Sequence, residues 1–269
     1  MSLVRLEQLE SVKEWYNINP FVTGGYRLPR SPLNALFSAF EWHNETLTIY
    51  SHLLPGIVWL YMFFNCVKED YYILSEPFTQ NVIRYSYLSA SLLGLASGTA
   101  HTFHIVNRAW SIVSWKLDFI GIIAINLCHQ ILDTYTVFHN NPKYIKLSVA
   151  IESIFALYCC IDIIVNLTNI HWGITYSSIS SIILTLPATY ISYHNDSLLL
   201  KRFSSYSRSC SYMVFIAGTI FFLGKIPERL WNPNGIFDNF NSHTWHHIFI
   251  VASIIYAFKA IPFLYLLEV

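Results

Sequence analysis

The amino-acid sequence predicts an all-α membrane protein, a bundle of seven transmembrane helices. Hydrophobic residues make up 54% of the chain and charged residues only 12%, which is about half the charged share of soluble domains. From residue 46 onward the chain is a series of apolar runs, each close to the roughly 20 residues that a helix needs to cross a bilayer. Backbone groups in lipid must be satisfied within their own segment, and the alternation typical of a membrane barrel is absent. Helices are therefore the form we expect.

Residues 1–45 form the one long polar region and are expected to lie in the cytosol. Apolar side chains recur here every three residues, at Leu3, Leu6, Leu9 and Val12. This spacing predicts a short amphipathic helix that lies on the membrane or on the bundle. The turn-forming residues of 19–29 predict irregular chain.

Residues 46–269 are expected to form the transmembrane domain. The expected helices cover about 46–67, 82–104, 115–138, 146–168, 174–193, 210–226 and 244–266. Basic residues divide almost evenly between the two sides of the bilayer, and only the amino-terminal region tips the balance toward a cytosolic N-terminus. Seven crossings then place the C-terminus on the extracellular or lumenal side, in a multi-pass protein of the plasma membrane or an endomembrane.

The charge and cysteine content narrow the classes of function. The formal net charge is zero, so nothing favours a nucleic-acid partner. None of the five cysteines forms a CxxC pair, and they are interpreted as small apolar residues within the membrane rather than as a disulfide framework.

Two histidines open the last apolar run. His243 and His247 are four residues apart, so a helix presents both imidazoles on one face, about one turn apart. This spacing suits metal ligands but is weak by itself. With seven crossings, His101 at the end of the second run and Asp118 at the start of the third lie in the same leaflet as both histidines.

Three neutral imidazoles plus a water make the open tetrahedral arrangement of a catalytic zinc site. Asp118 is the candidate acceptor of the proton of that water, and Ser97, one turn before His101, is a candidate hydrogen-bond partner of the water or of a substrate carbonyl. Zinc lowers the pKa of bound water to about 7. The chemistry predicted is hydrolysis of a carbonyl compound, with Asp118 and Ser97 as the candidate catalytic residues.

Structural alternatives stay open for each of these residues. The three histidines can instead form hydrogen bonds between helices, Asp118 can merely orient a histidine or the water, and Ser97 can serve helix packing. His104 and His246 each lie three residues from a predicted ligand and are alternative ligands.

Structural roles are expected for most of the other polar residues, and two alternatives stay open for the ionisable residues within the apolar runs. Asn44 is expected to cap the first membrane helix and Glu45 to favour its first turn. Structural roles are also expected for Tyr26, Arg27 and His43. Ionisable residues within the apolar runs line a polar cavity or pair with one another; they are His129, Asp133, Glu152 and Asp162.

Several motifs resemble the progestin and adipoQ receptor family, which includes the adiponectin receptors and the fungal zinc-homeostasis membrane proteins. They occur in the family's order from about residue 19 to the end of the chain. The motifs are Gly25-Tyr26-Arg27, His43-Asn44-Glu45-Thr46 followed by His52, Ser97-x-x-x-His101, Lys116-Leu117-Asp118-Phe119-x-Gly121, Ile226-Pro227-Glu228-Arg229 and Ser242-His243-x-x-x-His247.

The resemblance implies a seven-helix fold with a cytosolic N-terminus. It also implies a zinc ion held by His101, His243 and His247, with Asp118 and Ser97 beside the bound water. Adiponectin receptors are associated with ceramide hydrolysis, so the resemblance implies ceramide or a related sphingolipid as partner. Three positions depart from the family pattern without touching a ligand, namely Thr48, the loop 232–235 and Asn241.

Two functions follow, from different classes. The first is a zinc-dependent lipid amide hydrolase of the ceramidase type. The second is a receptor or zinc-homeostasis protein whose zinc is structural and which has an extracellular or cytosolic signalling partner. The three-histidine set favours the first, because structural zinc sites are usually closed by a fourth protein ligand.

Overall fold

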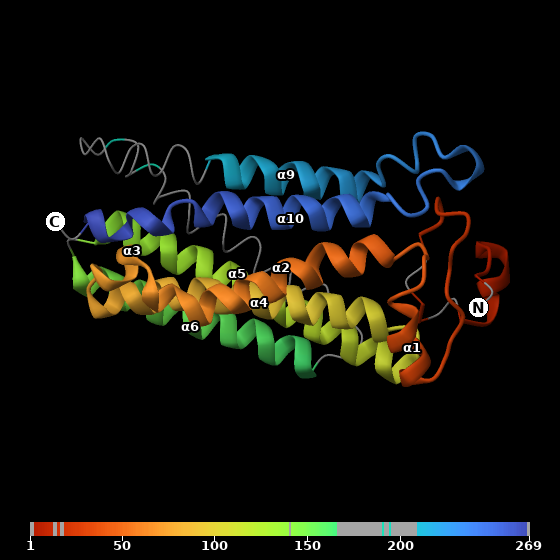
Figure 1. Cartoon of the computed structure of the whole chain (residues 1–269), viewed down its shortest axis with the longest axis horizontal. Coiled ribbons are helices and arrows are strands. Elements are labelled where there is room, and N and C mark those ends of the chain that lie inside the picture. The colour runs from red at the N-terminus through yellow and green to blue at the C-terminus, as the bar shows by residue number, and fades with distance from the viewer. Residues whose placement is uncertain are drawn as a thin grey trace. The chain divides into compact units, whose positions relative to one another are not determined.

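The computed structural model describes residues 3–12, 15–16, 19–139, 141–165, 190, 194 and 209–267. Within these residues the chain is all-helical, and a single β-bridge pairs Val4 with Tyr26. The α-helices are α1 (Pro32–Ser38), α2 (Thr46–Asn65), α3 (Asp70–Ile73), α4 (Pro77–Phe103), α5 (Arg108–Phe138), α6 (Pro142–Val165), α9 (Ser209–Gly224) and α10 (Ser242–Phe258) (Figure 1). Among the described residues, 3₁₀ helices cover Leu6–Val12, Cys66–Lys68, Pro233–Gly235 and Ile261–Leu267.

Six of the seven expected ranges are each occupied by a helix: α2, α4, α5, α6, α9 and α10. The range 174–193 lies outside the described residues, Tyr190 excepted. In the part of the chain that the structure describes, four helices are long and apolar enough to be candidate membrane spans: Thr46–Lys68, Arg108–Thr136, Pro142–Val165 and Ser242–Leu266. α4 is not among them although it has 27 residues, because it carries many serine and threonine side chains.

Three helices begin before the apolar runs from which the sequence analysis predicted them. α4 begins at Pro77 and α6 at Pro142, and proline suits the first helical position because its missing N–H would have no partner there. α5 begins at Arg108, seven residues before the expected start, because the side chain of Asn107 accepts a hydrogen bond from the backbone N–H of Trp110 at 3.0 Å. Proline or asparagine at these positions thus allows each helix to begin before its apolar run.

The chain divides into two compact units. The first unit comprises Met1–Pro55, Gly94–Asp118 and Met213–Ala252, and the second comprises Gly56–Leu93, Phe119–Tyr212 and Ser253–Val269. All the predicted site residues belong to the first unit.

The amino-terminal region packs into the core of the first unit. Leu9 is fully buried in an apolar cluster with Tyr16, Tyr26, Ala35 and Ile105 among others. The amphipathic segment that the leucine spacing predicted is a 3₁₀ helix over Leu6–Val12.

One carboxylate ties this region to the loop between α9 and α10. Asp238 accepts hydrogen bonds from the backbone N–H groups of Thr23 and Gly24 at 2.9 and 2.8 Å and from the Thr23 hydroxyl at 2.9 Å. The side-chain amide of Asn232 donates to the same carboxylate at 2.9 Å. The irregular chain at 19–29 is therefore held in one conformation by a residue more than two hundred positions away.

Small residues let the helices of the first unit approach closely. A Cβ atom at Gly98 of α4 would stand 2.8 Å from the Cβ atom of Leu53 on α2. α9 and α10 lie side by side (Figure 1), and a Cβ atom at Gly218 would stand 2.6 Å from the Cβ atom of Phe249. Both distances are too short for a larger side chain, so these two contacts depend on glycine.

In the second unit, Ile123 of α5 packs against Cys159 and Ile163 of α6. The buried carboxylate of Glu152 accepts hydrogen bonds through Oε1 from the hydroxyls of Thr134 and Ser148 at 2.9 and 2.8 Å. All five cysteines of the chain are free thiols.

Two of the intramembrane ionisable residues thus have hydroxyl partners, since the Tyr212 hydroxyl donates to Asp133 at 3.0 Å. These hydrogen bonds join carboxylates to hydroxyl groups, whereas the sequence analysis expected ionisable residues that pair with one another or line a polar cavity.

Candidate metal centre

Three histidines from two helices converge in the first unit. His101 lies in the last turn of α4, while His243 and His247 lie in the first two turns of α10. One potential ligand atom from each residue lies within 4.8 Å of the others. The ring centroids are separated by 4.9 Å for His101 to either partner and by 4.7 Å between His243 and His247. Within the described part of the chain this is the one group of three such side chains that could hold a metal ion.

The ring nitrogens of these histidines are available to a metal. Both nitrogens of His101 are buried and have no hydrogen-bond partner among the described residues, an arrangement that is costly unless a ligand satisfies them. Nδ1 of His247 lies 3.3 Å from the carbonyl oxygen of Thr48. A hydrogen bond there fixes the ring and leaves Nε2 as the donor atom, as is common for metal-binding histidines. The donor set therefore fits a cation that prefers imidazole nitrogen.

Asp118 and Ser97 lie beside the histidines but outside the ligand group. Both side chains are buried, and Asp118 interacts electrostatically with His101 and with the side chain of Ser97. The structure thus brings together all five residues that the sequence selected. It places Asp118 next to the histidines rather than among the atoms that could share one ion.

Glu45 is the carboxylate with the closest ties to the histidines of α4. Its Oε2 accepts a hydrogen bond from His104 Nε2 at 2.6 Å and pairs with the Arg27 guanidinium at 3.1 Å, while its Oε1 lies 3.6 Å from His101 Nδ1. Burial alone would raise the pKa of this carboxyl, but the neighbouring His104 and His101 hold the pKa well below its usual range. Glu45 is therefore an ionised anchor next to a candidate ligand, and not merely the residue that favours the first turn of α2.

Arg27 connects the amino-terminal region to the same place. Its fully buried guanidinium donates to the carbonyl oxygen of His101 at 2.7 Å and to the hydroxyl of Ser38 at 3.0 Å. Burial lowers the pKa of Arg27 and Glu45 opposes that shift. The carbonyl groups at the end of a helix lack intrahelical partners. The Arg27 guanidinium supplies a hydrogen-bond donor for one of these carbonyl groups of α4, that of His101.

His52 is a residue at the centre that the sequence did not select. It is buried on α2, and its ring centroid lies 3.9 Å from that of His247. The sequence did contain a signal for a functional role of His52, because an ionisable side chain within an apolar run marks a functional position. His52 also lies four residues after Thr48, on the same face of α2.

The alternative ligands lie outside the ligand group. His104 is hydrogen-bonded to Glu45 at 2.6 Å. The ring of His246 stacks on Phe222 with centroids 5.0 Å apart. Neither histidine belongs to the group whose ligand atoms lie within reach of one ion.

The helix caps around the centre differ from the expected ones. Asn44 does not cap α2 with its side chain, since its Oδ1 has no hydrogen-bond partner in the described structure. Instead the backbone N–H of His43 donates to the Thr46 hydroxyl at 2.8 Å, and Nδ1 of His43 accepts from the N–H of Glu45 at 3.1 Å. Burial, together with the charge of Arg27, lowers the pKa of His43 to about 3.

Asn241, one of the departures from the family pattern, caps α10. Its Oδ1 accepts hydrogen bonds from the backbone N–H groups of His243 and Thr244 at 3.0 and 3.3 Å. The departure therefore supplies the start of the helix that carries two of the three histidines. The expectation that the departures do not touch a ligand is wrong, because Asn241 contacts the backbone of His243 and the carbonyl oxygen of Thr48 lies 3.3 Å from Nδ1 of His247.

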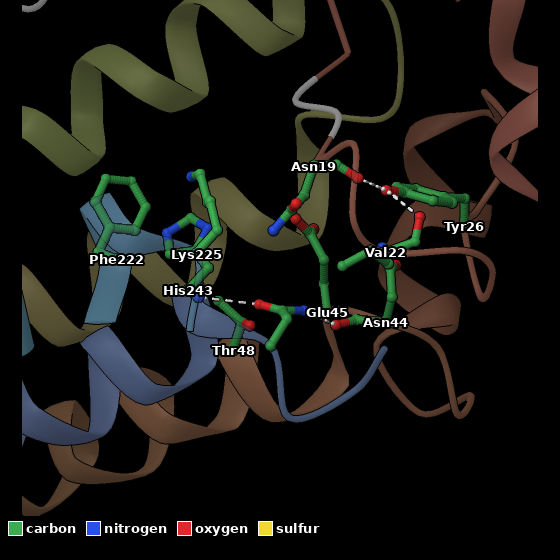
Figure 2. A pocket seen from close by; sticks show the side chains of 10 residues that line it. Asn19, Val22, Tyr26, Asn44, Glu45, Thr48, Phe222, Lys225 and His243 are labelled. Carbon is green, nitrogen blue, oxygen red and sulfur yellow. Dashed lines mark hydrogen bonds between the residues drawn. The ribbon is translucent and has the colours of Figure 1, made fainter. Parts of the chain in front are cut away.

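A cavity of about 60 Å³ adjoins His243, with room for water molecules. Figure 2 shows its walls, which come from three parts of the first unit. The lining residues are Asn19, Val22, Tyr26, Asn44, Glu45 and Thr48 from the amino-terminal region and α2, Phe222 and Lys225 from the end of α9, and Asn241 and His243 from the start of α10. The candidate centre thus has a polar space on the side that faces the amino-terminal region.

The fold and the site define an integral, multi-pass membrane protein of helices with a three-histidine candidate metal centre. The chain belongs to the haemolysin-III related family, whose model matches residues 40–258. The matched range contains all three histidines, Asp118 and Ser97.

Similar proteins carry names from the same group. Heptahelical transmembrane protein 3 of Arabidopsis thaliana is 24% identical over 92% of this chain and 83% of its own length. Progestin and adipoQ receptor family member 3 of Homo sapiens is 23% identical over 92% of this chain and 82% of its own length. Membrane progestin receptor gamma of Mus musculus is 30% identical over 44% of this chain and 36% of its own length. These matches confirm the resemblance on which the sequence prediction drew.

Proposed function

We propose that the protein binds one zinc ion through His101, His243 and His247 and hydrolyses an amide bond of a membrane lipid of the ceramide type. The observation that carries this proposal is the convergence of three imidazoles within 4.8 Å of one another, with a buried carboxylate beside them that is not one of the three. Three nitrogen ligands leave an open position, which structural zinc sites usually lack.

When bound, zinc supplies a Lewis acid for the amide carbonyl and lowers the pKa of a bound water to about 7. Asp118 accepts the proton of the attacking water, and its burial near His101 suits an acid–base role. The Ser97 hydroxyl holds the water or the substrate carbonyl by a hydrogen bond. Amide and water are converted to a fatty acid and an amine.

A cytosolic amino terminus belongs to the same proposal. In that orientation the candidate centre and the polar cavity beside His243 lie near the cytosolic leaflet, so water reaches the site from the cytosol while the lipid enters from the bilayer. The polar walls of the cavity support this route for water.

The second candidate function is that of a receptor or zinc-homeostasis protein with a structural zinc. The names of relatives, among them a membrane progestin receptor, support it.

The first experiment measures zinc in the purified protein and in His247→Ala. We expect about one zinc per chain in the unsubstituted protein and its loss in the variant. His246→Ala is the matched control, since this adjacent histidine lies outside the ligand group. Equal zinc content in all three proteins would contradict the metal site.

The second experiment separates the two functions. Asp118→Asn retains the shape of the side chain but removes its basicity, so we expect zinc to be retained and turnover of ceramide vesicles to be lost. Absence of turnover in the unsubstituted, zinc-loaded protein with short- and long-chain ceramides would favour the receptor.

A further inference from the structure

The outward face of α1 is apolar. The side chains that point away from the first unit are spaced as one helical stripe, i, i+3, i+4 and i+7. We call them the α1 stripe: Leu33, Leu36 and Phe37 on α1 and Phe40 in the turn just after it, with exposed fractions of 62, 44, 58 and 79%. A helix on a water-exposed surface presents polar residues outward. The α1 stripe has the opposite pattern, which indicates a non-aqueous partner.

Small residues occupy the inward face of α1 and hold the helix in this orientation. Ala35 is fully buried in the apolar cluster of the first unit. Ser38 is fully buried, and its hydroxyl donates to the carbonyl oxygen of Ala35 at 2.7 Å and accepts from Arg27 Nη1 at 3.0 Å. Rotation of the α1 stripe into the core would break these contacts and would leave the Arg27 guanidinium without one of its acceptors.

The position of α1 in the chain identifies the partner. α2, which begins the first candidate membrane span, starts at Thr46, six residues after Phe40. Trp42 stands between them and is 59% exposed, and tryptophan is enriched where a membrane protein meets the lipid head groups. The outer side chain of Leu54 on α2 is also exposed. Exposed apolar side chains therefore occur both on α1 and on the membrane span that follows it in the chain.

We propose that α1 is an interfacial helix whose stripe is embedded at the boundary between lipid head groups and acyl chains. Such helices lie in the plane of the membrane with the apolar face toward the acyl chains. The polar neighbours fit this placement, since Arg30 pairs with Glu41 at 3.4 Å at the two ends of the segment. The contact is independent of the metal centre and of the reaction proposed for it.

The test uses the full chain reconstituted in phosphatidylcholine vesicles. A nitroxide spin label is attached at Phe37→Cys, at Leu33→Cys as a second stripe position, and at Asn34→Cys as the control. Asn34 is exposed on the same helix but lies on its flank. The unsubstituted protein, treated with the same reagent, gives the background from the five native thiols.

Collision rates with oxygen, which concentrates in lipid, and with a water-soluble nickel chelate report the surroundings of each label. We expect the ratio of oxygen to nickel collisions to be at least about threefold higher at both stripe positions than at Asn34. Equal ratios at the three positions would overturn the proposal. Spin–spin broadening at Phe37 together with exclusion of both reagents would also overturn it, because the stripe would then face a second copy of the chain.

Discussion

Glu45→Gln removes the negative charge that stands next to a candidate metal ligand. The carboxylate has three partners, His104 at 2.6 Å, Arg27 at 3.1 Å and His101 at 3.6 Å. Glutamine keeps the size and one acceptor oxygen, so the side chain still fills the site. The Arg27 guanidinium, which is fully buried, then lacks its counter-charge.

This geometry leads us to expect two effects of Glu45→Gln, a loss of metal affinity and a loss of protein stability. Loss of the carboxylate that orients a metal-binding histidine typically lowers metal affinity about 10- to 100-fold, which corresponds to about 1.4 to 2.7 kcal/mol. Loss of one partner of a buried ion pair destabilises a protein by about 3 to 5 kcal/mol. Because the amide oxygen remains as an acceptor for Arg27, we expect the lower end of that range.

The assay is a titration of zinc-loaded protein in detergent with a chelator, followed by measurement of the zinc that the protein retains. Thermal unfolding of the same samples reports stability. The control is Glu41→Gln, because Glu41 pairs with Arg30 at 3.4 Å and its side chain is 34% exposed, so its loss changes stability by only about 0 to 1 kcal/mol. If Glu45→Gln binds zinc as tightly as Glu41→Gln does, the orienting role of Glu45 is refuted.

Three further substitutions test other parts of the first unit. His43 has a pKa of about 3 in the folded protein against 6.5 in the unfolded chain, so the free energy of unfolding falls as the pH drops from 6.5 toward 3. His43→Gln should reduce the slope of the unfolding free energy against pH in that window by about 1.4 kcal/mol per pH unit, measured by thermal unfolding. An unchanged slope would show that His43 is not neutral in the fold. Gly98→Ala places a Cβ atom 2.8 Å from that of Leu53 and should cost about 1 to 3 kcal/mol of stability in the same assay; an unaffected melting temperature would contradict the close approach of α2 and α4. Asn241→Ala removes the cap of the helix that carries His243 and should cost about 1 kcal/mol, whereas Asn241→Asp should keep most of it; equal loss in both variants would argue against capping.

Residue spacing predicted that the candidate ligand residues lie close together, because two residues four apart share one face of a helix. His243 and His247 share a helix face in any α-helix, and the order of the apolar runs put His101 and Asp118 at the same membrane face. The structure brings all of them into one compact unit.

The residues that support the ligands were harder to predict, because their contacts join segments that are distant in sequence. Glu45 has the position of a helix-start residue, and only the fold reveals His104 and Arg27 on either side of it. The capping role of Asn241 depends on where α10 begins, which an apolar run does not define to within a residue.

The helix starts illustrate the same limit. The apolar run of α5 begins near residue 115, yet Asn107 starts the helix at Arg108. Hydrophobicity locates the part of a helix that lipid or a core covers, whereas its ends are determined by individual polar side chains.

The division of the three histidines between α4 and α10 has a consequence for biosynthesis. A ribosome releases His101 long before it reaches His243, and α10 supplies two of the three imidazoles. The nascent chain therefore offers only one of the three candidate ligands until α10 has been translated and has joined its neighbours. For the proposed metal centre, loading is on that account a late event of assembly, and the content of bound ion would measure the fraction of molecules in which α10 is correctly inserted.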